Sequence, residues 1–445
     1  MSSPLSNPTF RRLFAAQICS LLGVGLLTVA LSLAAYRIGG AAAGGTLLGF
    51  LLALKMVAYV LLAPLAETLL ANVPRKRAMV SLDFGRMLLL LPMGLSTEIW
   101  HVAVLAFAFF VLAAGFTPLF QSVIPDVLPE EESYTKALAW SRIAYTMEAV
   151  LSPVIAAAVL NVVTGEALFL AAALAFLGSV LALLSIRFPA RGETAVKGPF
   201  LTRALRGMRI YAHTPRLRGL FLLNLALSVS MAWVLVNTVV YAGARLGNAE
   251  RFYPLLMACY GIGAASGAIF MPRLLKRIGE RQAMLTGAFG FAATGATFAL
   301  LPALPLPALA PIWLLFGATS SLVLTPGGLV ITRSATRADR AAVFAAQFSL
   351  SHAGWLVAYP LAGWLAGAVS LEPALLMLAA LSATIALMAM TVWPAHDPLQ
   401  RPHVHPDLPE DHPHLHAVPA LGRQHRHVHD FRIDDLHPSW RQSAI

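Results

Sequence analysis

The chain has 445 residues, of which 58% are hydrophobic and 12% are charged, and its mean hydropathy is +0.72. Soluble domains carry about 25% charged residues, so this composition excludes an ordinary soluble protein and indicates a membrane protein. The net charge of +11 does not indicate a nucleic-acid partner, because the basic residues gather in a few connecting segments. Two cysteines, Cys19 and Cys259, exclude a disulfide framework and a CxxC metal or redox motif.

Apolar runs recur along the chain, and each is long enough to cross a bilayer core about 30 Å thick. The segment Met1–Arg12 leads directly into the first run without a small-residue cleavage pattern, so we expect no removable signal peptide. The sequence predicts twelve spans, at 11–36, 45–70, 79–97, 100–124, 137–161, 165–188, 217–243, 252–273, 281–301, 308–332, 341–369 and 372–395.

Lysine and arginine are distributed unequally between the two sides of such a bundle. With an even number of spans, the connecting segments on the side of the termini hold 21 of them. The other side holds only Arg37, Arg245 and Arg251. The positive-inside rule therefore predicts that both termini and the central loop face the cytoplasm.

The chain also carries an internal repeat. The segment "NPTFRRLFAAQ" (7–17) aligns with "TPRLRGLFLLN" (214–224) at an offset of 207 residues. The pairs at this offset are Pro8 and Pro215, Arg11 and Arg218, Gln17 and Asn224, and Pro153 and Pro360. Such a series indicates two parallel halves of six helices each.

This layout resembles the major facilitator superfamily, whose two halves are parallel repeats with the substrate site between them. The family's turn between spans two and three, Gly-x-x-x-Asp-Arg-x-Gly-Arg-Arg, is replaced here by "APLAETLLANVPRKR", with Glu67 for the acid. "SLDFGR" then supplies Asp83 and Arg86 at the head of span three. In span five, "EAVLSPVIAA" keeps Pro153 of the family's antiporter motif, in a degenerate form with Glu148 in place of the first glycine.

The resemblance covers residues 1–395 and implies an all-α membrane protein with twelve transmembrane helices, a transporter and not an enzyme. We expect a first half over 1–188, a cytoplasmic central loop over 189–216, a second half over 217–395 and a disordered cytoplasmic tail over 396–445. The expected partners are the lipid bilayer and a transported substrate, with no nucleic acid, and the expected state is a monomer.

The energy source is predicted to be an ion gradient, because no lysine follows a glycine and a Walker A motif is therefore absent from the sequence. Ionisable groups inside spans then become candidates for coupling, since they are expensive in hydrocarbon. Glu148 is the candidate proton carrier or metal ligand, and a buried salt bridge with Lys55 or Arg142 is the alternative. Lys55, deep in span two, is either a fixed counter-charge or a coupling residue.

Further polar residues in the spans have structural and functional readings. Asp83 and Arg86 are expected to tie the basic turn to the helices. His352 is either a hydrogen-bonded packing residue or a ligand, and its repeat mate is Tyr145. The remaining candidates, Gln17 and Asn224, lie on spans one and seven, which line the cavity in the family that this chain resembles.

Ten of the thirteen histidines lie in the tail, among prolines and acids and without apolar periodicity. Neutral imidazole suits Ni²⁺, Co²⁺, Zn²⁺ and Cu²⁺, so the tail is predicted to bind divalent metal; a solvated tail with coincidental histidines is the alternative. The predicted ligands are His403, His405, His412, His414, His416, His425, His427, His429 and His437.

A body of this kind with a histidine-rich tail is similar to the bacterial nickel-resistance exporters of the NreB type. This resemblance implies export of Ni²⁺ from the cytoplasm in exchange for protons, with no resident cofactor. Two other functions stay open: a proton-coupled exporter of an organic compound or siderophore whose tail senses metal, and a membrane anchor that stores or senses metal without transporting it.

Overall fold

The computed structural model describes residues 4–62, 73–128, 130–188, 200–301, 304–336, 339–398, 400–403, 427–433, 436–437 and 440. Helices dominate these residues. The first half contains η1 (Pro4–Ser6), α1 (Pro8–Val57), the π-helical η2 (Ala58–Leu62), α3 (Arg75–Gly94), α4 (Ile99–Val127), α5 (Glu131–Val159) and α6 (Ala167–Leu184). After α7 (Phe200–His213), the second half contains α8 (Pro215–Leu246), α9 (Ala249–Leu300), α10 (Leu306–Leu324), α11 (Gly327–Ser334), α12 (Arg340–Val369) and α13 (Leu371–Val392).

Among the described residues, seven helices are long and apolar enough to cross a membrane by length and composition. Two of them are far longer than the roughly 20 residues that a crossing needs: α1 has 50 residues and α9 has 52. Each turns at a glycine with a positive φ, 58° at Gly40 and 71° at Gly279, a conformation that suits glycine because it has no Cβ. With α1 and α9 counted as two arms each, and α10 and α11 counted together as one segment, the described α-helices give six segments before α7 and six after it, consistent with the predicted twelve.

The internal repeat has a local structural counterpart. Pro8 is the first residue of α1 and Pro215 the first residue of α8, a position where the missing N–H of proline is no loss. The side chain of Asn7 caps α1 by accepting from the backbone N–H groups of Thr9 and Phe10, at 2.9 and 3.1 Å.

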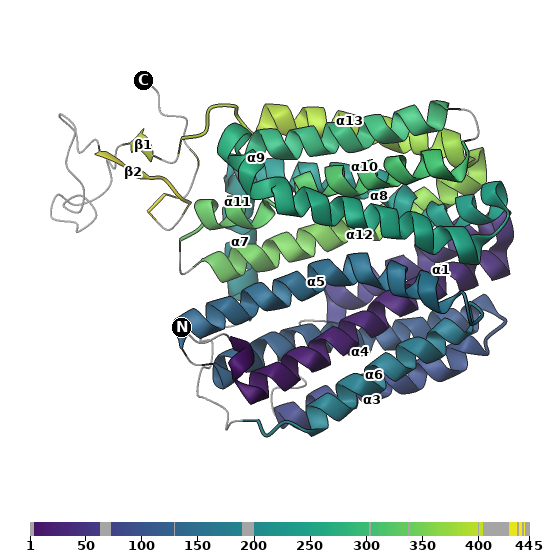
Figure 1. Ribbon diagram of the computed structural model, residues 1–445. Helices are drawn as coiled ribbons and strands as arrows, with labels where there is room; N and C mark the ends of the chain where they lie inside the picture. The colour runs from purple at the N-terminus through teal and green to yellow at the C-terminus, as the bar shows by residue number, and fades with distance from the viewer. Residues whose placement is uncertain are drawn as a thin grey trace.

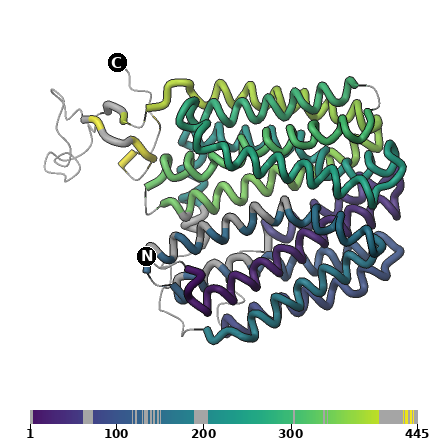
Figure 2. The backbone as a smooth tube through the Cα atoms, viewed as in Figure 1, coloured from purple at the N-terminus to yellow at the C-terminus, as the bar shows by residue number. Residues whose placement is uncertain are grey.

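The two halves form two bundles that lie side by side (Figure 1). The start of α1 and the tail strands lie at one end, which we call the terminal end; the opposite end is the distal end (Figure 1). Figure 2 shows the same division by chain order, with the first half at the purple and blue side and the second half at the green and yellow side.

Contacts between the halves close the distal end. The hydroxyl of Tyr253 in α9 donates to Ser32 Oγ in α1 at 2.9 Å, and Thr46 Oγ1 in α1 donates to the Gly363 carbonyl in α12 at 3.1 Å. A Cβ at Gly363 in α12 would overlap the backbone of Gly45 in α1, and a Cβ at Gly45 would overlap the side chain of Asn237 in α8. Small residues therefore let α1 approach α8 and α12 closely.

The central loop predicted over 189–216 contains a helix, α7, in its described part. Arg206 Nε donates to Asp339 Oδ1 at 2.5 Å, Tyr211 donates to Gln347 Oε1, and Gly207 lies against the backbone of Ala342, so α7 packs on the start of α12. Ile210 and Tyr211 are buried on that face. Apolar residues at helical spacing, set between basic ones, give this segment one apolar face. Burial of that face against α12 is the physical reason why the segment is a helix and not the predicted loop.

The tail also differs from the expected disorder where the structure describes it. Strand β1 (Gln400–His403) pairs with β2 (His427–Asp430) in an antiparallel register that places His403 opposite His427. Phe431 and Ile433 follow β2 and are buried. Those two apolar side chains supply the packing that the composition of the tail did not lead us to expect.

Candidate functional site

Charged and polar side chains from both halves form a layer deep inside the bundle. The layer contains Lys55 and Tyr59 from the second arm of α1 and η2, Arg86 from α3, Tyr145 and Glu148 from α5, and His352 from α12. Electrostatic interactions connect Tyr59 with Arg86 and Glu148, and Lys55 with Glu148 and His352. The layer brings together four of the predicted candidates, Lys55, Arg86, Glu148 and His352.

Glu148 lies where α5 packs against Gly25 of α1. A Cβ at Gly25 would stand 3.0 Å from Glu148 Oε1 and would overlap the side chain of Ser152. Glycine at this point of α1 therefore leaves the space that the carboxyl group occupies. Glu148 is half-buried, so part of its side chain remains accessible.

Lys55 stands among aromatic rings. Its Nζ lies 5.7 Å from the centre of the Tyr59 ring and 5.9 Å from that of Phe110, distances at which a cation is attracted to the ring face. Glu148 acts on Lys55 electrostatically, but among the described residues the two side chains form no direct ion pair. The salt bridge that we considered as an alternative for Glu148 and Lys55 is thus a longer-range interaction in this structure.

His352 faces the first half from α12. Its ring lies against that of Phe348, with centroids 3.9 Å apart and a tilt of 32° between the planes, and lies 6.0 Å from the ring of Tyr59. Nδ1 lies 2.7 Å from the carbonyl oxygen of Phe348, which can only accept, so Nδ1 carries the hydrogen. The neutral ring then has a lone pair on Nε2, the arrangement found in metal-binding histidines whose other nitrogen is held by a carbonyl.

Asp83 and Arg86 form a buried ion pair one helical turn apart on α3. Ser179 of α6 donates to Asp83 Oδ2 at 2.5 Å. The guanidinium carbon of Arg86 lies 4.4 Å from the centre of the Phe116 ring and 4.7 Å from that of Phe176. This pair joins α3 to α4 and α6.

Three other candidates lie apart from the layer or cannot be placed. Gln17 is buried and donates to Ser141 Oγ on α5 at 2.6 Å, and Asn224 donates to Leu220 of its own helix at 2.8 Å. Both contacts stay within one half. The side chain of Arg142 lies outside the described residues.

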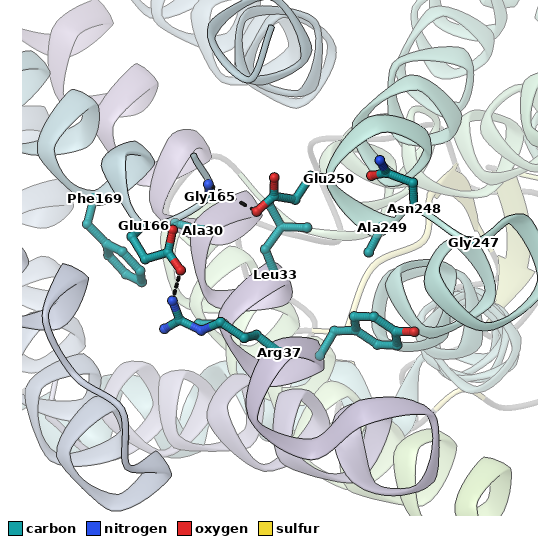
Figure 3. A pocket seen from close by; sticks show the side chains of 12 residues that line it. Ala30, Leu33, Arg37, Gly165, Glu166, Phe169, Gly247, Asn248, Ala249 and Glu250 are labelled. Carbon is teal, nitrogen blue, oxygen red and sulfur yellow. Dashed lines mark hydrogen bonds and ion pairs between the residues drawn. The ribbon is translucent and has the colours of Figure 1, made fainter. Parts of the chain in front are cut away.

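A cavity of about 300 Å³ lies at the distal end, between the halves. Figure 3 shows Arg37 paired with Glu166 on the first-half side, and Glu250 of α9 reaching across to the first half. Glu250 Oε1 accepts from the backbone N–H of Gly165 at 3.1 Å, so this carboxylate helps to close the distal end. None of the residues that line this cavity belongs to the layer around Glu148, and none of them is a predicted site residue.

The predicted tail ligands fall into three groups. His403, His427 and His429 belong to the strand pair, where His403 is the register partner of His427 and His429 that of Arg401. His437 is 4% exposed and packs against Phe431, with ring centroids 5.0 Å apart, so it lies away from open solvent. His405, His412, His414, His416 and His425 lie outside the described residues, as does Glu67.

The described residues contain no group of three or more His, Cys, Asp or Glu side chains that could hold a metal ion. Across the layer, Glu148 offers one carboxylate from the first half and His352 one imidazole from the second. These two ligand types suit a divalent transition metal, with water or the substrate's own ligands completing its coordination.

Sequence reasoning did not find Tyr59, Gly25 or Ser152 as parts of this layer. The spacing of Lys55 and Tyr59, four residues apart, places both on one helix face and could have indicated the tyrosine. Gly25 and Ser152 gave no such signal, because their role depends on the approach of α1 to α5.

Comparison with known proteins gives matches over most of the chain. The family model of the Major Facilitator Superfamily matches residues 13–248 and, a second time, residues 221–428. Macrolide efflux protein A from Streptococcus pyogenes is 25% identical over 288 residues, which cover 61% of this chain and 67% of that protein. Macrolide efflux protein A from Enterococcus faecalis is 26% identical over 249 residues, 53% of this chain and 72% of that protein.

Solved structures share the fold at low sequence identity. The nucleoside transporter NupG superposes with a TM-score of 0.68 at 13% identity, covering 87% of this chain and 100% of that one. An inward-facing bacterial homologue of the human lysosomal transporter Spinster gives a TM-score of 0.69 at 14% identity, covering 88% and 98% of the two chains. The fold predicted from the sequence is confirmed.

Proposed function

Because this chain belongs to the Major Facilitator Superfamily, we propose that it is a secondary active exporter that removes a divalent transition-metal ion, Ni²⁺ in the first place, from the cytoplasm in exchange for protons. The exporter is a monomer in the bacterial inner membrane, with both termini in the cytoplasm, and it confers metal resistance. The efflux proteins among its relatives support the direction of transport. The ten tail histidines support the choice of a metal cargo.

The observation that carries this proposal is the carboxyl group of Glu148. It lies deep in the bundle, is half-buried, and forms no direct ion pair with Lys55 among the described residues. An accessible carboxyl group without a fixed counter-ion can exchange a proton for a cation, which a permanently paired carboxylate cannot do without breaking its pair.

The exchange takes place because the layer is reached in turn from the cytoplasm and from the outside. With the path open to the cytoplasm, deprotonated Glu148 and Nε2 of His352 hold the metal between the halves. With the path open to the outside, a proton neutralises the carboxylate and the metal leaves. Protonation removes the negative charge that holds the metal, so protonation and metal binding at Glu148 exclude each other.

A second candidate function is export of an organic compound, with the tail as a metal sensor. The named relatives are macrolide efflux proteins, and aromatic rings contact the charged groups of the layer: Tyr59 and Phe110 lie beside Lys55, and Phe348 lies beside His352. The absence of a three-ligand group among the described residues also favours this candidate.

Accumulation in cells separates the two candidates. Cells that express the chain, cells that express Glu148→Gln and cells that express neither are loaded in parallel with Ni, Co, Zn, Cu, Fe and a radiolabelled macrolide. We expect the intact chain alone to lower retained ⁶³Ni. Unchanged metal retention with lowered macrolide retention would reject metal export in favour of the second candidate.

A further inference from the structure

The last described residues of the chain pack on the base of the second half. Phe431 is 5% exposed and Ile433 is 1% exposed, and the ring of Phe431 meets those of His437 and Trp440 at centroid distances of 5.0 and 5.2 Å. Aromatic side chains in such edge-to-face packing hold one geometry and keep each other from water. These residues, Phe431, Ile433, His437 and Trp440, form a cluster that we call the C-terminal anchor.

Arg216 joins the anchor to the transporter body. Its guanidinium carbon lies 5.0 Å from the centre of the Trp440 ring, and its Nε lies 3.2 Å from Asp397 Oδ2. Arg216 is 2% exposed, so the ring and the carboxylate meet it in a dehydrated setting where both attractions are strengthened. Asp397 follows α13 and Trp440 lies 43 residues later, so both ends of the tail reach the same arginine.

The place of Arg216 in the fold makes this contact specific to one half. Arg216 is the second residue of α8, directly after the joint with α7. At the repeat offset of 207 residues its counterpart in the first half is Thr9, which has no charge and a short side chain. The contact between the tail and Arg216 therefore has no equivalent at the repeat position in the first half.

The strand pair fixes the other boundary of the tail. Gln400 pairs with Asp430 and His403 with His427, so the chain that leaves β1 returns to its starting point at β2. Five of the tail histidines lie between β1 and β2 in the sequence.

We propose that the C-terminal anchor is a docking element for the base of α8, and that it keeps the histidine-rich segment at the terminal end of the second half. The occupant of this surface is the chain's own C-terminus. The inference rests on the proposed function only in its consequence, namely that metal captured by the tail is delivered beside the path. The docking itself does not depend on the cargo.

Two deletions separate the anchor from the histidines. Deletion of 431–445 removes the anchor but keeps nine of the ten tail histidines, whereas deletion of 396–445 removes all ten. Trp440→Ala is a milder variant that keeps the whole chain. Trp100→Ala is the matched control, because Trp100 is 59% exposed at the start of α4, far from the tail in the fold.

Hydrogen exchange of the purified full-length protein tests the docking directly. We expect the backbone amides of 427–433 to exchange slowly in the intact protein and in Trp100→Ala, and rapidly in Trp440→Ala. If these amides exchange as rapidly in the intact protein as in Trp440→Ala, the proposal is overturned, because a docked segment protects its amides.

Transport at low metal tests the consequence. We expect the 431–445 deletion to lose as much ⁶³Ni export at low cytoplasmic nickel as the 396–445 deletion, at equal membrane levels. Full export by the 431–445 deletion would show that histidines act without the anchor and would overturn the delivery role. If the intact chain exports no metal at all, the proposed function fails, while the exchange experiment still decides the docking.

Discussion

Replacing Asp83 by asparagine is expected to destabilise the first half by about 3–5 kcal/mol, the cost of removing one partner of a buried ion pair. Asp83 is 0% exposed and Arg86 is 1% exposed, so the guanidinium that remains cannot recover its hydration. The phenyl rings of Phe116 and Phe176 stay in contact with Arg86 and soften the loss by about 0.5–2 kcal/mol. The net loss of about 3 kcal/mol corresponds to more than a hundredfold change in the folding equilibrium.

Equilibrium unfolding of the purified protein in mixed micelles, followed by tryptophan fluorescence, measures this loss. Glu372→Gln is the matched control, because Arg245 and Glu372 form an ion pair whose side chains are 49% and 30% exposed, and its loss costs less than about 1 kcal/mol. Adding Arg86→Met to Asp83→Asn should restore most of the stability, since it removes the stranded charge. The reasoning is refuted if Asp83→Asn is no less stable than Glu372→Gln, or if the double variant is no better than the single one.

Three further predictions concern transport and pH. Cells that express Glu148→Gln at normal membrane levels should retain as much ⁶³Ni as cells without the protein, because an amide cannot exchange a proton. If Glu148→Gln transports as well as the Glu372→Gln control, Glu148 has a structural role. Recovery of a defective Lys55→Ala variant by Glu148→Gln would instead identify the two residues as an ion pair. Deletion of 396–445 should lower export most at low cytoplasmic metal and least at high metal, because it removes imidazoles and no membrane-spanning group; abolished export at every concentration would place the tail in the transport site. Burial raises the pKa of Tyr211, so folding favours its neutral form. The stability that the neutral form contributes is fully present below the unfolded pKa of about 10. It is lost only as the pH rises through the higher folded pKa. Hydrogen exchange of α7 should therefore show the same protection from about pH 6 to about pH 9 after correction for intrinsic rates, and a protection loss within that window would contradict the contact with α12.

The sequence was sufficient for the fold because a bilayer imposes strong rules. Helices must be about 20 residues long and apolar, so spans are visible as hydropathy runs. The repeat identified Pro8 and Pro215 as matching positions, and both begin a helix because proline is tolerated there. Asp83 and Arg86 were expected to tie the basic turn to the helices, and in the structure they pair with each other within α3.

The site could be predicted only in part, because its contacts join distant helices. Glu148, Lys55 and His352 were identified as costly charges or imidazoles inside spans. Hydropathy gives no register between helices, so the space that Gly25 leaves for Glu148 could not be inferred. For the same reason Gln17 and Asn224, which are repeat mates, were expected to line a cavity, whereas each bonds within its own half.

The tail illustrates a different limit. Composition suggested disorder, because the segment as a whole lacks apolar periodicity. A few apolar residues are enough to order a segment that can pack on a folded surface. Phe431 and Ile433 are buried, the Phe431 ring packs on Trp440, and Trp440 contacts Arg216 in α8. Such docking depends on an arginine more than 200 residues away, which local pattern cannot show.

Nickel flux in proteoliposomes tests the central claim most directly. The purified chain is reconstituted in vesicles that carry an imposed pH gradient, and ⁶³Ni movement and internal pH are recorded together, with Glu148→Gln vesicles as the control. The account predicts that nickel moves against its gradient while protons move the opposite way, and that both fluxes are absent with Glu148→Gln. Proton-coupled movement of a macrolide without any nickel flux, or nickel flux unchanged by Glu148→Gln, would contradict it.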